Sequence, residues 1–250
     1  MKKKSIIALI PARSGSERVP EKNIKRLGPH PLIAYTISAA KESELFDDIV
    51  VSTDSKTYAK IAEYYGASSP FLRPSEISGS KSPDKEWVSY TLDKLEKDMK
   101  CKYEYFSILR PTSPFRTAET IKRAWNQFSK DKNSESIRAI ELIKQHPGKA
   151  WILSEKKRIN PLFDHEIEGN PWHSSQYAAL PEIYIQNASI EIAKSLVIEK
   201  YGTISGKKIM PFFTDNFEGF DINNKEDWVL AKHYINKDNV ELPKVLAKPF

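Results

Sequence analysis

A loop at residues 11–23 combines small residues with cations in a way that suits a bound polyphosphate. It follows an apolar run, so we expect it to leave the end of a strand. Small residues at 14–16 let backbone N–H groups approach an anion, while Arg13, Arg18 and Lys22 supply positive charge. The glycine spacing matches neither the lysine-containing phosphate loop of ATPases nor a dinucleotide fingerprint. A basic surface turn is the alternative that composition alone leaves open.

Asp221 is the carboxylate best placed to hold a divalent cation. It follows Phe220 at the expected end of a late strand, from which its oxygens could hold Mg²⁺ against phosphate. The alternative is that Asp221 caps a helix expected to begin near Asn224. Asp54, at another strand end, is open to the same two interpretations, and capping is favoured there.

Three apolar runs that end in polar residues are expected to be the strands that position these groups. They cover residues 5–11, 48–54 and 105–109. Helical spacing lies between and after them at 32–41, 56–65 and 117–128, with Gly66 as a C-terminal cap and Thr117 as an N-cap. This alternation predicts an α/β fold, a mostly parallel sheet with helices on both faces.

The second half of the chain is less regular. Residues 146–177 are rich in Pro, Asn, His and Trp without a sustained period, so we interpret 144–190 as an insertion within a single domain of 1–250. Strands are expected at 180–192 and 207–213. A helix at 224–235 should follow, and its apolar stripe is expected to include Trp228, Val229 and Leu230.

Charge and cysteine content argue against several classes of protein. The net charge is +6, yet the 39 Lys and Arg are scattered among 33 Asp and Glu, and no nucleic-acid-binding motif is recognised. The single cysteine, Cys101, excludes an intramolecular disulfide and fits the cytoplasm. The apolar stretch at 6–10 is too short for a signal peptide or a membrane span. We therefore expect no nucleic acid and no membrane among the partners.

Six segments, in order along the chain, resemble the acylneuraminate cytidylyltransferases, or CMP-sialic acid synthetases. They are 12–16 with 20–23, 49–54, 72–77, 109–116 (Leu-Arg-Pro-Thr-Ser-Pro-Phe-Arg), 180–182 with 187–188, and 220–223 (Phe-Asp-Ile-Asn). The resemblance implies a fold like that of the nucleotide-diphospho-sugar transferases. It also implies Mg²⁺-dependent transfer of CMP from CTP to a sialic acid-like (nonulosonic) sugar acid, with release of pyrophosphate. A homodimer joined through the insertion is the implied assembly.

The resemblance also suggests roles for individual residues. Arg13, Lys22 and Asp221 are the expected catalytic groups, and Asn223 stands where the family often has a second metal-binding aspartate. Arg73 would lie near the cytosine base, unless it bridges to Glu76. The expected nucleotide-binding residues are Ala12, Arg13, Ser14, Gly15, Ser16, Lys22, Asn23, Arg73 and Ser82. The expected substrate-binding residues are Arg110, Thr112, Ser113, Gln176, Gln186 and Asn187.

Two departures from the family pattern bear on the acceptor. Arg110 replaces a common glutamine, and no arginine stands close before Asn187 to grip a sugar carboxylate. We therefore hypothesise that Arg110 grips that carboxylate. The departures also leave open a different acid, a phosphonate or a sugar phosphate as acceptor. A nucleotide-binding relative without catalytic activity is a further alternative.

Overall fold

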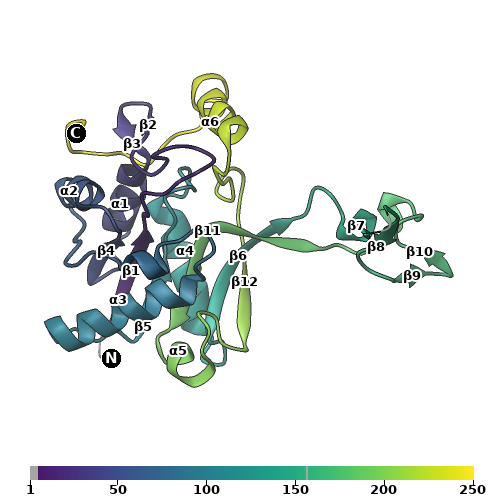
Figure 1. Ribbon diagram of the computed structural model, residues 1–250, viewed down its shortest axis with the longest axis horizontal. Helices are drawn as coiled ribbons and strands as arrows, with labels where there is room; N and C mark the ends of the chain where they lie inside the picture. Colours follow the sequence, from purple (N-terminus) through teal and green to yellow (C-terminus); the bar gives the residue numbers. More distant parts are fainter. Residues whose placement is uncertain (1–4, 156) are drawn as a thin grey trace. The chain divides into compact units, whose positions relative to one another are not determined.

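The computed structural model describes residues 5–155 and 157–250, which form two compact units. Unit 1 combines the described residues up to 139 with residues 187–250, and unit 2 covers 140–186 (Figure 1). In the described part of the chain, no helix has the length and apolar character needed to cross a membrane.

A six-stranded sheet forms the centre of unit 1, in the order β12-β6-β11-β5-β1-β4. Its strands are β1 (Ile6–Pro11), β4 (Asp48–Ser52), β5 (Tyr105–Ile108), β6 (Ser136–Leu142), β11 (Tyr184–Lys194) and β12 (Ile209–Phe213), of which β6 and β11 run on into unit 2. β1 pairs in parallel with both β4 and β5, whereas β11 is antiparallel to β5. β1 is buried on both faces, which explains its continuous apolar sequence.

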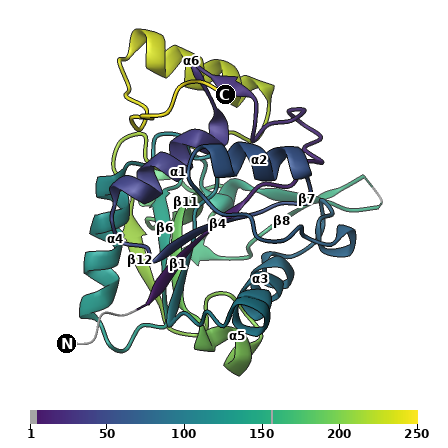
Figure 2. The same cartoon turned by 90° about the vertical axis from the view of Figure 1, so that its left-hand side faces the viewer.

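Helices cover both faces of this sheet, as predicted (Figure 2). The helices are α1 (Leu32–Glu42), α2 (Lys56–Tyr64), α3 (Asp84–Met99), α4 (Ala118–Lys130), α5 (Leu196–Tyr201) and α6 (Lys225–Lys237). Ile6, Ala8 and Ile10 of β1 pack with α1, α2 and α4, whereas Ile7 and Leu9 pack with α3 and α5. The alternation follows because successive strand side chains point to opposite faces. A third cluster joins α6 to the start of α1.

Helix caps explain several of the boundaries. Thr117 begins α4 in a capping box with Thr120, as the sequence predicted for this N-cap. Ser55 caps α2 and Asn224 caps α6, so neither Asp54 nor Asp221 has the capping role that was open to it. Gly66, just after α2, has a φ of +92°, which favours glycine.

The apolar stripe expected on α6 is wrong in two of its three members. Trp228 is buried, but Val229 and Leu230 are 67% and 42% exposed. Ala231, three residues after Trp228, is buried in their place. Consecutive helix residues diverge by about 100°, so three in a row cannot share one face.

Short elements complete unit 1. A two-stranded ribbon of β2 (Arg26–Leu27) and β3 (His30–Pro31) precedes α1, and a 3₁₀ turn covers Ser75–Ile77.

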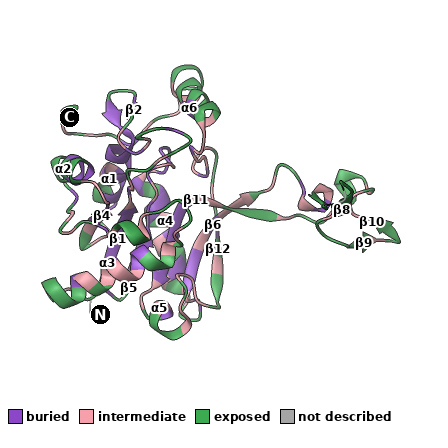
Figure 3. Ribbon diagram, viewed as in Figure 1, coloured by how far each residue is buried: buried purple, intermediate pink, exposed green. Residues whose placement is uncertain are grey.

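Unit 2 consists of small hairpins and turns. β7 (Trp151–Leu153) pairs with β8 (Ile159–Pro161), and β9 (Glu166–Ile167) pairs with β10 (Asn170–Pro171), both antiparallel. 3₁₀ turns cover Pro147–Lys149 and Tyr177–Ala179. Trp172 contacts the rings of His146 and His165, but most of this unit is exposed (Figure 3). A two-stranded hairpin has little core of its own.

Candidate active site

A cavity of about 400 Å³ opens at the carboxyl ends of the parallel strands in unit 1. The loop after β1, the segment between α2 and α3, the start of α3 and the segment after β5 line it, together with residues of β11 and of the segment before α6. Its lining residues are Pro11, Arg13, Ser16, Lys22, Asn23, Arg73, Ile77, Gly79, Ser80, Ser82, Asp84, Trp87, Arg110, Pro111, Thr112, Ala188, Asp221 and Asn223. The expected catalytic residues Arg13, Lys22 and Asp221 therefore meet at one cavity.

The loop at 11–23 is tied to the end of β4. The Asp54 carboxylate accepts hydrogen bonds from the backbone N–H and the hydroxyl of Ser14, at 2.7 and 2.8 Å. The buried Ala12 donates its backbone N–H to the Ser52 carbonyl oxygen at 3.0 Å. Asp54 thus orients the loop, a role that neither of its two sequence interpretations included.

Within the loop, several polar groups are already hydrogen-bonded to one another. The backbone N–H of Ser16 donates to the Ser14 carbonyl oxygen, and the Arg13 guanidinium donates to the Gly15 carbonyl oxygen. The amide nitrogen of the buried Asn23 donates to the Arg13 carbonyl oxygen at 3.2 Å. The backbone donors of Ser14 and Ser16 are therefore engaged within the protein in this conformation.

Lys22 connects the loop to the far end of the chain. Its ammonium nitrogen donates to the Ile222 carbonyl oxygen at 2.7 Å. Burial lowers the pKa of Lys22, and the nearby Asp221 carboxylate opposes this effect. The result is a partly desolvated cation beside the candidate metal ligand.

Asp221 lines the cavity, and one of its two carboxylate oxygens is unsatisfied. Its Oδ2 accepts from the Asn223 side-chain amide at 2.7 Å, while its buried Oδ1 has no hydrogen-bond partner among the described residues. An unsatisfied carboxylate oxygen on a residue that lines the same cavity as Arg13 and Lys22 suits a divalent cation. The described residues contain no cluster of three or more His, Cys, Asp or Glu side chains that could hold a metal.

Arg73 is a buried part of the cavity wall. It donates to the Ser52 hydroxyl at 3.1 Å and to the Ser52 carbonyl oxygen at 2.8 Å. The bridge to Glu76 that the sequence left open is not formed. Its guanidinium lies 4.9 Å from the centre of the Trp87 ring. Burial lowers the pKa of Arg73 to about 10, so it remains a cation at neutral pH. The Ser52 contacts keep its guanidinium plane fixed.

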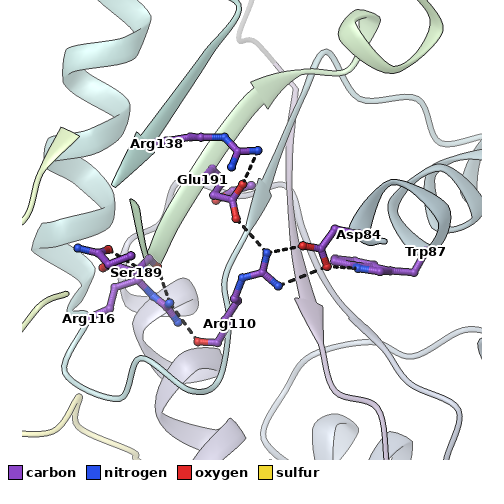
Figure 4. A network of polar contacts seen from close by, with 9 residues as sticks. Asp84, Trp87, Arg110, Arg116, Arg138, Ser189 and Glu191 are labelled. Carbon is purple, nitrogen blue, oxygen red and sulfur yellow. Dashed lines mark hydrogen bonds and ion pairs between the residues drawn. The ribbon is translucent and has the colours of Figure 1, made fainter. Parts of the chain in front are cut away.

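Arg110 lies in a network of four charged side chains (Figure 4). Its Nη2 is 2.6 Å from Asp84 Oδ2 and 3.0 Å from Glu191 Oε1. Arg138 contacts the other Glu191 oxygen at 3.0 Å. Although burial disfavours the charge, these two carboxylates hold the pKa of Arg110 above its usual value. The arginine expected to grip a substrate carboxylate thus has two carboxylates of the protein as partners.

Arg116 supports this region from behind. It is fully buried, and its guanidinium donates to the carbonyl oxygens of Arg110 and Ser189 at 3.2 and 2.6 Å (Figure 4). Its Nη2 also donates to the Thr36 hydroxyl at 2.8 Å, which ties α1 to the segment after β5. The last residue of the 109–116 motif is therefore structural.

Comparison with known proteins shows the family. Residues 7–161 match the cytidylyltransferase family model. This chain belongs to the cytidylyltransferase family. It is 34% identical over 231 residues to a CMP-N,N'-diacetyllegionaminic acid synthase of Legionella pneumophila, with 91% of this chain and 94% of that protein covered. It is 30% identical over 234 residues to an N-acylneuraminate cytidylyltransferase of Escherichia coli, covering 94% of this chain and 53% of that protein.

The fold of this cytidylyltransferase is also found among solved structures. A CMP:2-keto-3-deoxy-manno-octonic acid synthetase complexed with CTP has a TM-score of 0.67 at 12% identity, over 94% of this chain and 100% of that chain. At this identity the likeness confirms the α/β nucleotidyltransferase fold.

The remaining predicted site residues of this cytidylyltransferase are dispersed. Ser82 and Thr112 line the cavity, and the Thr112 carbonyl oxygen accepts from the Ile222 N–H at 2.8 Å. Ser113 is buried, and Asn187 donates to the Thr214 hydroxyl at 2.9 Å. Gln176 and Gln186 are exposed and belong to unit 2. Their roles stay predictions.

Sequence reasoning missed the acidic partners of Arg110. Asp84 and Glu191 come from the start of α3 and from β11, neither of which is close to Arg110 in sequence. The α3 helix itself was not predicted. The signal that could have found Asp84 is the Pro-Asp-Lys-Glu start at 83–86, with acidic residues in the first turn of a helix.

Proposed function

We propose that this chain transfers CMP from CTP to a sialic acid-like (nonulosonic) sugar acid and releases pyrophosphate. The observation that carries the proposal is the meeting of Arg13, Lys22 and Asp221 at one cavity, in a chain 34% identical to a CMP-diacetyllegionaminic acid synthase. The acceptor hydroxyl attacks the α-phosphorus of CTP. The bond between that phosphorus and the oxygen that bridges it to the β-phosphorus breaks, this oxygen leaves with pyrophosphate, and the hydroxyl proton passes to solvent.

In this reaction the protein mainly positions reactants and balances charge. Arg13 and Lys22 would bind the triphosphate, and the Lys22 ammonium would stabilise negative charge that develops on the leaving pyrophosphate. The bond from Lys22 to the Ile222 carbonyl oxygen holds the ammonium in place before substrate arrives. Arg73, fixed on Ser52, would form the nucleotide end of the cavity.

We propose that the reaction depends on Mg²⁺. The free Oδ1 of Asp221 supports this, and Asn223 would keep the carboxylate oriented through its amide bond to Oδ2. The bound ion would supply charge neutralisation for the triphosphate.

We propose a homodimer joined through unit 2. Many large apolar side chains of this unit are exposed: Trp151, Ile152, Leu153, Ile159, Leu162, Phe163, Tyr177, Tyr184 and Ile185. Apolar exposure of this kind is typical of an interface. We also propose a cytoplasmic location, because a single cysteine fits a reducing compartment.

The test is pyrophosphate release by the purified protein with Mg²⁺. CTP, GTP, UTP and ATP should be crossed against sialic, legionaminic, pseudaminic and ketodeoxy sugar acids, a phosphonate and a sugar phosphate. Turnover with CTP and a nonulosonic acid is expected. Turnover only with another nucleotide would replace the proposed donor, and turnover only with a phosphonate or a sugar phosphate would replace the proposed acceptor class. CTP binding without any turnover would favour a non-catalytic relative.

A further inference from the structure

We propose that Asp84 is a positioning residue for the acceptor side of the site and acts through Arg110. The inference rests on the proposed function, because the acceptor role of Arg110 belongs to that proposal. Asp84 is the first residue of α3, and its side chain points at the Arg110 guanidinium from the opposite side to Glu191 (Figure 4). Both Asp84 and Arg110 line the cavity.

The contact between Asp84 and Arg110 fixes the guanidinium plane. Asp84 Oδ2 lies 2.6 Å from Nη2, and Oδ1 lies 3.4 Å from Nη1. Nη2 also donates to Glu191 Oε1 at 3.0 Å, so both of its N–H groups are used. A guanidinium has five N–H donors, and these contacts leave Nε–H and one N–H of Nη1 for a ligand. Two carboxylates on different elements thus decide which donors Arg110 offers.

Charge balance decides what those donors recognise. Arg110 and Arg138 carry two positive charges, and Asp84 and Glu191 carry two negative charges at distances of 2.6 to 3.0 Å. The cluster is therefore neutral, and its attraction for a further anion is weak. Arg110 held in this way is a directional donor to a neutral oxygen, such as a hydroxyl or an acylamino carbonyl of the sugar. This replaces the hypothesis that it grips the acceptor carboxylate.

Asp84 also accepts a hydrogen bond from Trp87, on the nucleotide side of the cavity. An asparagine at position 84 could still accept this hydrogen bond. The Trp87 indole N–H donates to Asp84 Oδ1 at 2.7 Å, and the Trp87 ring lies beneath the Arg73 guanidinium. An asparagine at position 84 retains one oxygen for this indole N–H and loses the charge that holds Arg110. The Asp84→Asn change therefore tests the contact with Arg110 while it keeps the contact with Trp87.

The experiment compares Asp84→Asn with Asp93→Asn, an exposed aspartate on the same helix. We expect Asp84→Asn to raise the KM for the sugar acid by about tenfold and to leave the KM for CTP within about twofold, since the charge-assisted hydrogen bonds to Arg110 are lost while Arg73 keeps its hydrogen bonds to Ser52. Asp93→Asn should match the wild type. In an Arg110→Gln background, Asp84→Asn should add no further rise. Equal rises of both KM values, or a fully additive double variant, would overturn the proposal.

A second measurement is independent of turnover. Phenylglyoxal modifies accessible arginines, and peptide mass spectrometry reports the rate at each one. In the wild type Arg110 should react more slowly than Arg13, and Asp84→Asn should accelerate Arg110 alone. Equal wild-type rates at the two arginines would overturn the assignment. A wild-type protein inactive with every acceptor would refute the proposed function, while these rates would still decide whether Asp84 holds Arg110.

Discussion

The Lys22 ammonium nitrogen lies 2.7 Å from the carbonyl oxygen of Ile222, although the two residues are 200 positions apart. The N–H of Ile222 in turn donates to the Thr112 carbonyl oxygen at 2.8 Å. The loop after β1, the segment after β5 and the segment that carries Asp221 are therefore joined through one peptide region. This junction brings the candidate phosphate ligand and the candidate metal ligand to the same place.

Replacing Lys22 by methionine removes the ammonium while it keeps an unbranched side chain. We expect kcat/KM for CTP to fall about 10²-fold, which is typical for the loss of one charge-stabilising donor. Steady-state kinetics with CTP varied provides the measurement. Lys60→Met, on the exposed face of α2, is the control and should keep the wild-type value. A fall of less than threefold for Lys22→Met would show that the triphosphate lies elsewhere.

The affinity for CTP should decrease in alkaline solution. Burial lowers the pKa of Lys22 below 10.5, with Asp221 opposing, and the charged form exists below that pKa. The Kd for CTP should thus rise as pH increases through the lowered pKa. A Lys22→Arg variant, cationic throughout, should show a flatter profile in titration calorimetry. Identical profiles for the two proteins would assign the alkaline loss to another group.

The same group affects stability with the opposite sign. Between the lowered folded pKa and 10.5, the unfolded chain binds more protons at Lys22 than the folded chain does. The contribution of Lys22 to the free energy of unfolding therefore rises with pH across that window. Urea unfolding of the wild type and of Lys22→Met over this range provides the measurement. The free energy of unfolding of the wild type minus that of Lys22→Met should rise with pH. A difference that stays constant with pH would contradict this.

Asp221→Asn tests the proposed metal ligand. The variant keeps an oxygen and loses the charge, so we expect the half-saturating Mg²⁺ concentration for turnover to rise about tenfold. Glu226→Gln removes an exposed carboxylate from the nearby first turn of α6 and serves as the control. If Asp221→Asn and Glu226→Gln require the same Mg²⁺ concentration, Asp221 is not the ligand.

Asp54→Ala tests whether the loop at 11–23 is held in its binding conformation. Two hydrogen bonds from Ser14 are lost, and the loop must be ordered again when CTP binds, so the Kd for CTP should rise about tenfold. Ser14→Ala removes only the hydroxyl bond and should show a smaller rise. Fluorescence or calorimetric titration with CTP would measure both. Equal affinity in Asp54→Ala and the wild type would show that Asp54 is not needed to order the loop.

Sequence alone determined much of the framework. The apolar runs at 5–11, 48–54 and 105–109 are strands of the central sheet, and Thr117 caps the helix after them. These features depend on local periodicity and capping, which neighbouring residues decide. The same reasoning failed at α6, where Val229 and Leu230 are exposed, because apolar composition without helical spacing does not define a face.

Sequence also identified Arg13, Lys22 and Asp221 as candidate site residues. Cations and small residues after a strand can bind an anion, and a carboxylate after a late strand can bind a metal ion. Only the tertiary structure decided their partners. Asp54 holds Ser14, and Asp84 and Glu191 hold Arg110, across contacts between distant segments. Electrostatic interactions depend on distance in space and on burial, which the order of residues along the chain does not contain. Arg110 therefore looked like a free cation in the sequence and is part of a neutral cluster in the folded protein.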